Sequence, residues 1–275
     1  MENLKKKIQE VVNLYQSQKF ILAEQKAKSI LINNSKIGFL YNLLGLILVG
    51  QTKYNDAIKY YQKGIEIEPN NAMIYNNLGA VYKTKNKHTL AENYYNKSIQ
   101  LDNKIPETQN NIGNLYIELN KYDDAINSFK EAININSEFY IAYYNLGILH
   151  KSLGNLKESK KYFEKTIEKK PDFYSAHRAY SQVNNYTDNH NHIKLMEDIY
   201  SKKNINVSGK ISLSFALGKA FDDTQKYKKA VKYYNEGNKL RKKNIKFLIN
   251  DEKKEFKNIK KLFSKTFLKN SLNIK

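Results

Sequence analysis

The stretch Tyr75-Asn-Asn-Leu78-Gly79 decides the fold, because the chain returns to the same pattern at a fixed interval. Successive glycines of this pattern stand 34 residues apart along the chain. A period of between about 20 and 50 residues is typical of architectures in which like units stack on one another. The other copies are Tyr41-x-x-Leu44-Gly45, Gln109-x-x-Ile112-Gly113 and Tyr143-x-x-Leu146-Gly147.

Each repeat has a second half with its own recurring residues. A small residue follows each glycine by twelve positions, and an aromatic residue comes four positions later, such as Ala91 and Tyr95. Apolar residues recur at the three- and four-residue spacing of helices, and small residues let two helices approach closely. Asn86, Asn120 and Gly154 lie between the halves and tolerate the left-handed conformation of a tight turn. Each repeat is therefore predicted to be a pair of antiparallel helices.

These residues resemble the tetratricopeptide repeat, and the full motif covers about residues 38–171. The resemblance implies an all-α solenoid, a right-handed superhelix of antiparallel helix pairs in which the first, or A, helices line a groove. It also implies a function, a scaffold that binds an extended or helical peptide segment of another protein in that groove. No single pair can bury its apolar face alone, so the pairs are expected to stack.

The repeat signal weakens toward both ends of the chain. Near the N-terminus Leu14, Ala23 and Ile30 keep the spacing although the glycine is missing. A polar stretch, residues 184–192, is expected to be a loop. A final amphipathic helix, residues 251–268, is expected to cap the solenoid. Its apolar side is expected to pack against the helix that carries Tyr233 and Tyr234, through Phe256, Ile259, Phe263 and Phe267. We predict a degenerate capping repeat (1–36), four full units (37–171), a degenerate repeat with a loop and short-helix insertion (172–210), and a last unit with the capping helix (211–275).

Asparagines recur in the A helices at positions outside the apolar core. An amide carries both a donor and an acceptor, so a row of them can pair with the backbone of an extended peptide. The row resembles the asparagine ladder of O-linked N-acetylglucosamine transferases. Asparagine is abundant in this chain, so composition bias alone is the competing interpretation. The candidate peptide-binding residues are Asn42, Asn76, Asn77, Asn110, Asn111 and Asn145.

The composition narrows the classes of partner. The net charge of +20 suggests nucleic acid, since cations that neutralise phosphates dominate such binding. However, only Arg178 and Arg241 among the 47 basic residues are arginine, the side chain best suited to phosphate and base contacts. We therefore expect a protein partner, with nucleic acid as the weaker alternative. The apolar run 37–50 is too short for a membrane span, and no secretory signal is recognised, so we expect a cytoplasmic protein that does not enter membranes.

No motif for catalysis or for a cofactor stands out. The chain has no cysteine, and it lacks the glycine-rich phosphate loops and the zinc and hydrolase motifs of known enzymes. His190 and His192 could suggest a metal, but a solvated loop is the favoured interpretation. Asp222 and Asp223 are adjacent, and adjacent helical residues do not face each other. We expect no enzyme activity, no cofactor and no metal.

The C-terminal third resembles the last repeat module of bacterial tetratricopeptide–sulfotransferase proteins. The resemblance rests on Ile193-x-x-Met196-Glu197, on residues 213–223, and on Tyr234-Asn-Glu-Gly237. It implies an alternative function, a substrate-presenting region that works with a sulfotransferase domain absent from this chain. The sequence leaves the partner and the oligomeric state open.

Overall fold

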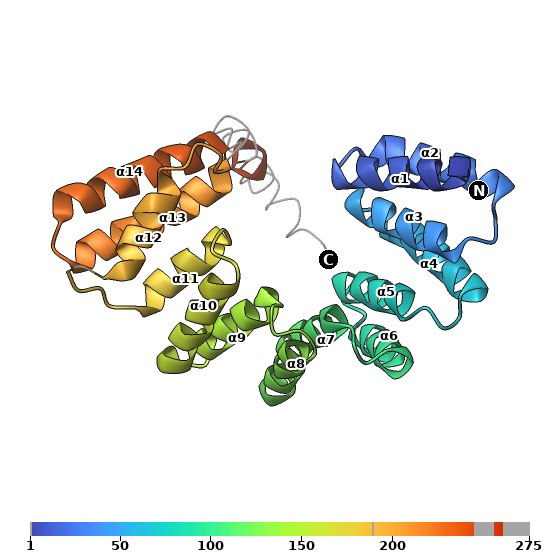
Figure 1. Ribbon diagram of the computed structural model, residues 1–275, viewed down its shortest axis with the longest axis horizontal. Coiled ribbons are helices and arrows are strands. Elements are labelled where there is room, and N and C mark those ends of the chain that lie inside the picture. Colours follow the sequence, from blue (N-terminus) through green and yellow to red (C-terminus); the bar gives the residue numbers. More distant parts are fainter. Residues whose placement is uncertain (1, 189, 245–255, 261–275) are drawn as a thin grey trace, which may run out of the picture. The chain divides into compact units, whose positions relative to one another are not determined.

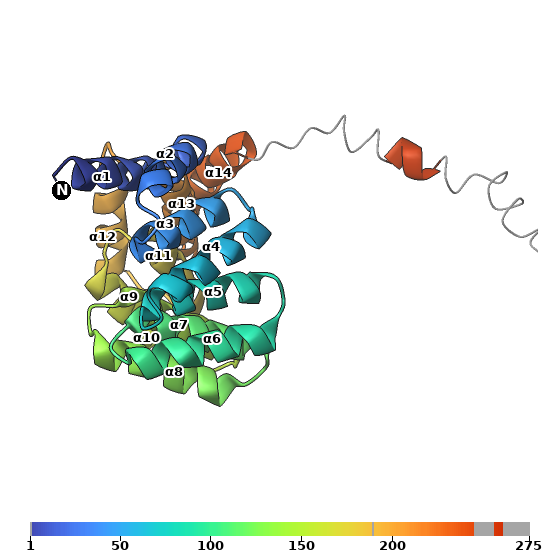
Figure 2. The same ribbon diagram turned by 90° about the vertical axis from the view of Figure 1, so that its right-hand side faces the viewer.

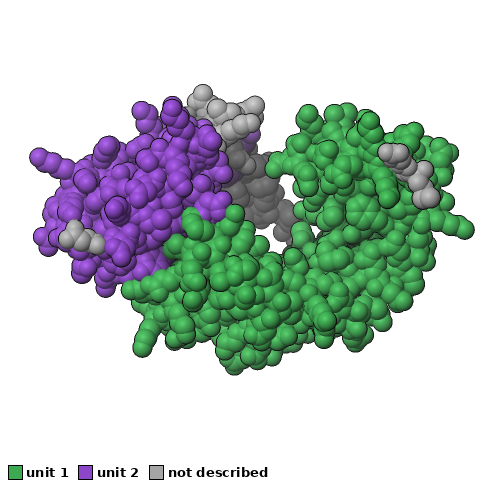
Figure 3. All heavy atoms as spheres, viewed as in Figure 1, with its two compact units in different colours: residues 1–171 green, residues 172–275 purple. Residues whose placement is uncertain are grey.

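The computed structural model describes residues 2–188, 190–244 and 256–260, and within these ranges all regular structure is helical, without strands. The chain divides into two compact units (Figure 3): unit 1, Met1–Pro171, and unit 2, Asp172–Lys275. The predicted all-α fold is confirmed.

Unit 1 is a series of hairpins, each made of an A helix followed by a B helix. Figure 2 shows successive hairpins as layers, and in Figure 1 they follow an arc with α3, α5 and α7 on its inner side and α4, α6 and α8 outside. The A helices also contact one another from hairpin to hairpin. The A helices are α1 (Glu2–Gln16), α3 (Gly38–Gly50), α5 (Ala72–Thr84), α7 (Pro106–Glu118) and α9 (Tyr140–Ser152). The B helices are α2 (Phe20–Asn33), α4 (Tyr54–Ile67), α6 (His88–Leu101), α8 (Tyr122–Ile135) and α10 (Leu156–Lys169).

The repeat glycines lie where an A helix crosses the B helix of its own hairpin. A Cβ atom at Gly79 would lie 2.8 Å from the ring of Tyr95, which is fully buried on α6. The same clash would occur between each other motif glycine and the aromatic residue sixteen positions later, so the prediction of close crossings is confirmed. These pairs are Gly45 with Tyr61, Gly113 with Phe129, Gly147 with Phe163 and Gly218 with Tyr234.

One residue in the left-handed conformation ends each A helix of unit 1. Asn86 has φ 55°, and the next amide, that of Lys87, donates back to the carbonyl of Tyr82 at 2.9 Å. This is a Schellman-type ending, which satisfies carbonyls that the helix leaves free. The other residues with positive φ in these turns are Gln18, Thr52, Asn120 and Gly154. Gln18 keeps the 34-residue spacing, so the N-terminal hairpin follows the repeat although it lacks the motif glycine.

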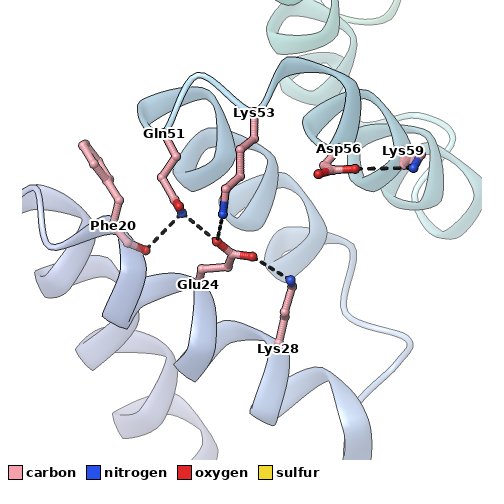
Figure 4. A network of polar contacts seen from close by, with 7 residues as sticks. All are labelled: Phe20, Glu24, Lys28, Gln51, Lys53, Asp56 and Lys59. Carbon is pink, nitrogen blue, oxygen red and sulfur yellow. Dashed lines mark hydrogen bonds and ion pairs between the residues drawn. The ribbon is translucent and has the colours of Figure 1, made fainter.

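A polar network joins the N-terminal hairpin to the next one (Figure 4). The carboxylate of Glu24 on α2 accepts hydrogen bonds from Lys28, Lys53 and Gln51, at 2.6, 3.0 and 2.8 Å. Burial alone raises the pKa of Glu24, but these three donors outweigh it and lower the pKa to about 2. The side chain is 13% exposed, so the network fixes α2 against the α3–α4 turn.

Unit 2 departs from regular hairpins. Its helices are α11 (Tyr174–Val183), α12 (Asn191–Tyr200), α13 (Val207–Asp223) and α14 (Tyr227–Asn244). Both α11 and the short α12 pack against α13, which forms a hairpin with α14. Arg178 on α11 lies over the ring of Phe215 on α13, 4.8 Å from its centroid.

Most of the predicted capping helix, residues 251–268, lies outside the described residues. The described part, residues 256–260, is helical. Phe256 and Ile259 are 74% and 47% exposed, which contradicts the expectation that both pack against α14.

Candidate protein-binding face

The asparagines of successive A helices form hydrogen bonds with one another across the hairpin boundary. Asn77 Nδ2 on α5 donates to Asn42 Oδ1 on α3 at 2.9 Å. In each pair the donor belongs to the later helix, and the two residues are 35 positions apart. The two candidate rows of asparagines are therefore the two sides of one ladder that links α3, α5, α7 and α9. The other rungs are Asn111 to Asn76, 3.0 Å, and Asn145 to Asn110, 2.8 Å.

Two of the six asparagines predicted to bind a peptide are buried within the ladder. Asn76 is 3% exposed and Asn110 is 7% exposed, so the expectation that all six asparagines lie on an exposed wall is wrong for these two. The asparagine of the following A helix donates a hydrogen bond to each of them. Asn76 also donates to Asn77 Oδ1 at 3.4 Å, which extends the ladder within α5.

The donor asparagines keep one N–H group available. Each amide nitrogen carries two N–H donors. Asn77, Asn111 and Asn145 are half-buried, and each uses one N–H in the ladder. Among the described residues, none of these nitrogens has a second acceptor. A peptide carbonyl could therefore accept the remaining N–H.

The second residue of each A helix from α3 to α9 forms an exposed row beside the ladder. Phe39 is 47% exposed, Met73 40% and Ile141 36%, and Glu107 is also exposed. Residues three apart on a helix are neighbours on one face, so each member of this second-residue row adjoins the residue at the ladder's acceptor position. The repeat pattern does not reveal the three apolar members, because an apolar residue in a repeat is typical of the core.

Other residues of the A helices extend the same face. Positions seven and ten residues after the second-residue row share its side of the helix. They are Leu46 and Val49 on α3, Ala80 and Lys83 on α5, Asn114 and Ile117 on α7, and Ile148 and Lys151 on α9. We call the second-residue row, the ladder and these positions the inner face.

The inner face carries few charges for a chain with a net charge of +20. Its charged members are Lys83, Glu107 and Lys151. Lys83 forms an ion pair with Glu118 on α7 at 2.9 Å, so its charge is matched. The excess of lysine therefore lies elsewhere, and the inner face is mainly apolar and amide-rich.

Unit 2 contains a buried cluster of histidine and tyrosine side chains. His192 Nε2 lies 2.9 Å from Nδ1 of His177, and its Nδ1 lies 2.8 Å from the hydroxyl of Tyr186. Burial, together with the neighbouring His177 and His190, lowers the pKa of His192 to about 3. His192 is 8% exposed, so the expectation of a solvated loop histidine is wrong: the loop folds over it and Tyr186 holds it in place.

Neither candidate for metal binding or catalysis gains support from its surroundings. In the part of the chain that the structure describes, no three His, Cys, Asp or Glu side chains gather as a metal site would need. Asp223 forms an ion pair with Lys219 and accepts a hydrogen bond from the Tyr186 amide at 3.2 Å. These contacts attach the loop to the end of α13.

Family models match the chain over most of its repeats. Models described as TPR repeat and tetratricopeptide repeat match residues 45–86, 72–105, 113–154, 140–173 and 211–244. The chain belongs to the tetratricopeptide-repeat family. No curated protein matches the sequence.

Solved structures of other tetratricopeptide-repeat proteins share the fold at low sequence identity. A thermophilic TPR protein from Thermus thermophilus is 17% identical, with a TM-score of 0.59, covering 66% of this chain and 98% of its own. A TPR protein from Parabacteroides merdae is 20% identical, with a TM-score of 0.56, covering 87% and 94%. Pseudomonas aeruginosa pilF is 22% identical, with a TM-score of 0.56, covering 74% and 91%. At these identities the likeness concerns the fold alone.

Nothing in the comparisons indicates an enzyme family, and the tetratricopeptide-repeat fold in general mediates protein interactions. Among the described residues, no helix combines the length and apolar character that a bilayer-crossing segment needs.

Proposed function

We propose that the chain is a scaffold that binds a segment of another protein along the inner face of unit 1. The observation that carries this proposal is the exposure of Phe39, Met73 and Ile141 in one row beside the asparagine ladder. Exposed apolar side chains that gather on one face mark interaction sites. The ladder adds an N–H donor in each of α5, α7 and α9. The backbone of a bound segment could therefore accept hydrogen bonds from the ladder while its side chains contact the apolar row.

Nucleic acid is the weaker alternative because the charge distribution does not favour it. A phosphate backbone needs several cations that converge. The cations of the inner face are Lys83, which forms an ion pair with Glu118, and Lys151, and Glu107 adds a negative charge. Binding at the inner face is therefore expected to change little with salt, whereas binding of a polyanion by the other lysines would weaken steeply.

The relationship to sulfotransferases stays a prediction of the sequence. The family models match residues 211–244 as a tetratricopeptide repeat, which is the coarser part of that resemblance. If the relationship holds, residues 1–275 alone should still not bind the sulfonucleotide donor. Calorimetric titration tests this, and saturable binding that survives moderate salt would reveal a donor site.

The proposed function is tested by capture of partners on the intact chain and two variants. The inner-face variant carries Phe39→Ser, Met73→Ser and Ile141→Ser. The control carries Leu90→Ser and Leu156→Ser, which lie on α6 and α10 and are 39% and 52% exposed. All of these side chains are at least one-third exposed, and circular dichroism checks that each variant folds. A partner should bind wild type and the control and be lost from the inner-face variant. Equal capture by all three proteins would contradict the proposal.

A further inference from the structure

The second-residue row presents a fixed order of side-chain chemistry. Along the A helices the row consists of an aromatic residue, a methionine, a carboxylate and an isoleucine: Phe39, Met73, Glu107 and Ile141. All four are exposed, and they come from four consecutive A helices that contact one another. A segment that crosses these helices would therefore meet two apolar sites, one acidic site and one more apolar site in turn.

Glu107 is the one member of the row that carries charge. Among the described residues, no cation lies within ion-pairing distance of its carboxylate. It follows Pro106 in the first turn of α7, where a negative charge also suits the helix dipole. A solvated carboxylate between apolar neighbours favours a cationic side chain of a ligand over an acidic one, since a like charge there would be repelled.

The spacing of the row fits an extended chain. Packed helices lie about 8–10 Å apart. An extended peptide advances about 3.3 Å per residue, so about three residues span the step from one A helix to the next. A bound segment would then place every third side chain against the row, while its backbone lies near the donors of the ladder.

We propose that the inner face selects an extended segment of a partner protein with apolar side chains opposite Phe39, Met73 and Ile141 and a lysine or arginine opposite Glu107. This inference rests on the proposed function and specifies the chemistry of the partner. The bound segment would be about ten residues long, with one contacting side chain at every third position. In order, these four side chains are apolar, apolar, basic and apolar, read in one chain direction or the other. The net charge of the whole chain, +20, would instead favour an acidic segment. The charge of the segments that bind therefore distinguishes recognition by Glu107 from attraction by the net charge.

A displayed library of random segments, about twelve residues long, tests the pattern on the intact chain. The targets are wild type, the inner-face variant, the control variant with Leu90→Ser and Leu156→Ser, and Glu107→Lys. Wild type and the control should enrich segments with the apolar–apolar–basic–apolar order. The inner-face variant should lose them, and Glu107→Lys should replace the basic residue by an acidic one without changing the apolar positions.

Binding constants of a synthetic enriched segment make the test quantitative. Replacing its basic residue by glutamate should weaken binding to wild type about three- to tenfold, as expected for a solvated ion pair turned repulsive. The same replacement should strengthen binding to Glu107→Lys by a similar factor. An exposed carboxylate supports no core, so this variant is expected to fold.

The outcomes separate this inference from the proposed function. Enriched acidic segments that the inner-face variant loses would overturn the inference and leave inner-face binding intact. Segments that bind the inner-face variant as well as wild type would overturn both. A library from which nothing is enriched on wild type would also overturn both.

Discussion

Asn145 on α9 donates a hydrogen bond from Nδ2 to Oδ1 of Asn110 on α7, at 2.8 Å. The pair shows how the A helices of unit 1 are tied to one another by side chains at corresponding places in successive repeats. Asn110 is buried, so its amide depends on protein partners and cannot be left to water. The ladder is thus part of the packing between hairpins as well as part of the surface that a ligand would meet.

Asn111→Ala should therefore weaken both binding and stability. It removes the donor to Asn76 Oδ1, and an unsatisfied buried acceptor costs about 1–3 kcal/mol. Asn76 is 3% exposed, so water cannot readily replace the lost donor. Urea unfolding followed by circular dichroism measures the effect.

The matched control is Asn114→Ala, one turn further along α7, where the amide makes no hydrogen bond within the described part of the chain. For partner binding, each of Asn77→Ala, Asn111→Ala and Asn145→Ala should cost about 0.5–1.5 kcal/mol, the net contribution of one hydrogen bond. If Asn111→Ala is as stable as Asn114→Ala, the ladder does not stabilise the array. A triple variant that binds its partner as tightly as wild type would leave composition bias as the explanation of the asparagines.

Gly79→Leu should destabilise unit 1 by about 1–3 kcal/mol, because the crossing of α5 and α6 has no room for a side chain. Even the Cβ atom would lie 2.8 Å from the ring of Tyr95. Combining the substitution with Tyr95→Leu removes the ring and should make the added cost of the leucine smaller. Thermal unfolding of both variants and of Tyr95→Leu alone completes the cycle. A cost for Gly79→Leu that is the same with and without the ring would show that Tyr95 is not the obstacle.

Thr52→Gly should stabilise unit 1 by about 0.5–1 kcal/mol, because Thr52 lies in a left-handed conformation that a β-branched residue adopts only with strain. Its φ is 60°, a value that glycine adopts freely. Replacing a glycine by alanine at the corresponding turn of another hairpin tests the strain of the left-handed conformation in the opposite direction. Gly154 has φ 79° and open space around it, so Gly154→Ala should cost about 1–2 kcal/mol through the backbone alone. Shifts of the urea midpoint in the same direction for both variants would contradict this account.

The stability of unit 2 should fall as the pH is lowered below about 6.5, the pKa of an unfolded histidine. His192 has a folded-state pKa of about 3, so the folded state resists taking up that proton. Between these values the unfolded state binds more protons than the folded state, so acid favours unfolding, and above about pH 6.5 the contribution is flat. Between about pH 7 and pH 5 we expect a loss of about 1–2 kcal/mol from this group.

Peptide-resolved hydrogen exchange of α11 and α12 in the intact chain measures that loss. His192→Leu should reduce the difference in protection between the neutral and the acidic condition, once the intrinsic pH dependence of exchange is removed. His190→Gln in the same loop should reduce that difference less, because His190 is only half-buried and is the smallest of the three causes that lower the pKa of His192. A pH dependence that is the same in wild type and His192→Leu would assign it to other groups.

The sequence predicted the regular part of the fold because the glycine and the aromatic residue of each hairpin meet at one crossing. Once Gly79 and Tyr95 are recognised as partners, the 34-residue spacing predicts the corresponding pair in each other hairpin. The left-handed Gln18 and Thr52 could not be predicted, since neither residue type favours that conformation and only the helices around the turn impose it.

The candidate site was predicted in part. Repetition revealed the asparagines, but the pairing of Asn77 with Asn42 depends on how two A helices face each other, which spacing along one helix does not determine. The burial of His192 could not be predicted for a similar reason: its partner His177 is fifteen residues away, and a stretch rich in asparagine is typical of a solvated loop. The only sign in the sequence that Phe39 and Met73 are exposed is that neither stands at a position of the repeat that packs into the core.

Hydrogen–deuterium exchange of the intact chain, with and without a segment enriched by the library, tests most directly whether the inner face is the binding site. The account predicts that the segment slows exchange in α3, α5, α7 and α9, the helices that carry the second-residue row. It also predicts that the inner-face variant shows no such change at the same segment concentration. Slower exchange confined to the B helices α4, α6, α8 and α10, or to the lysine-rich α14, would contradict the account.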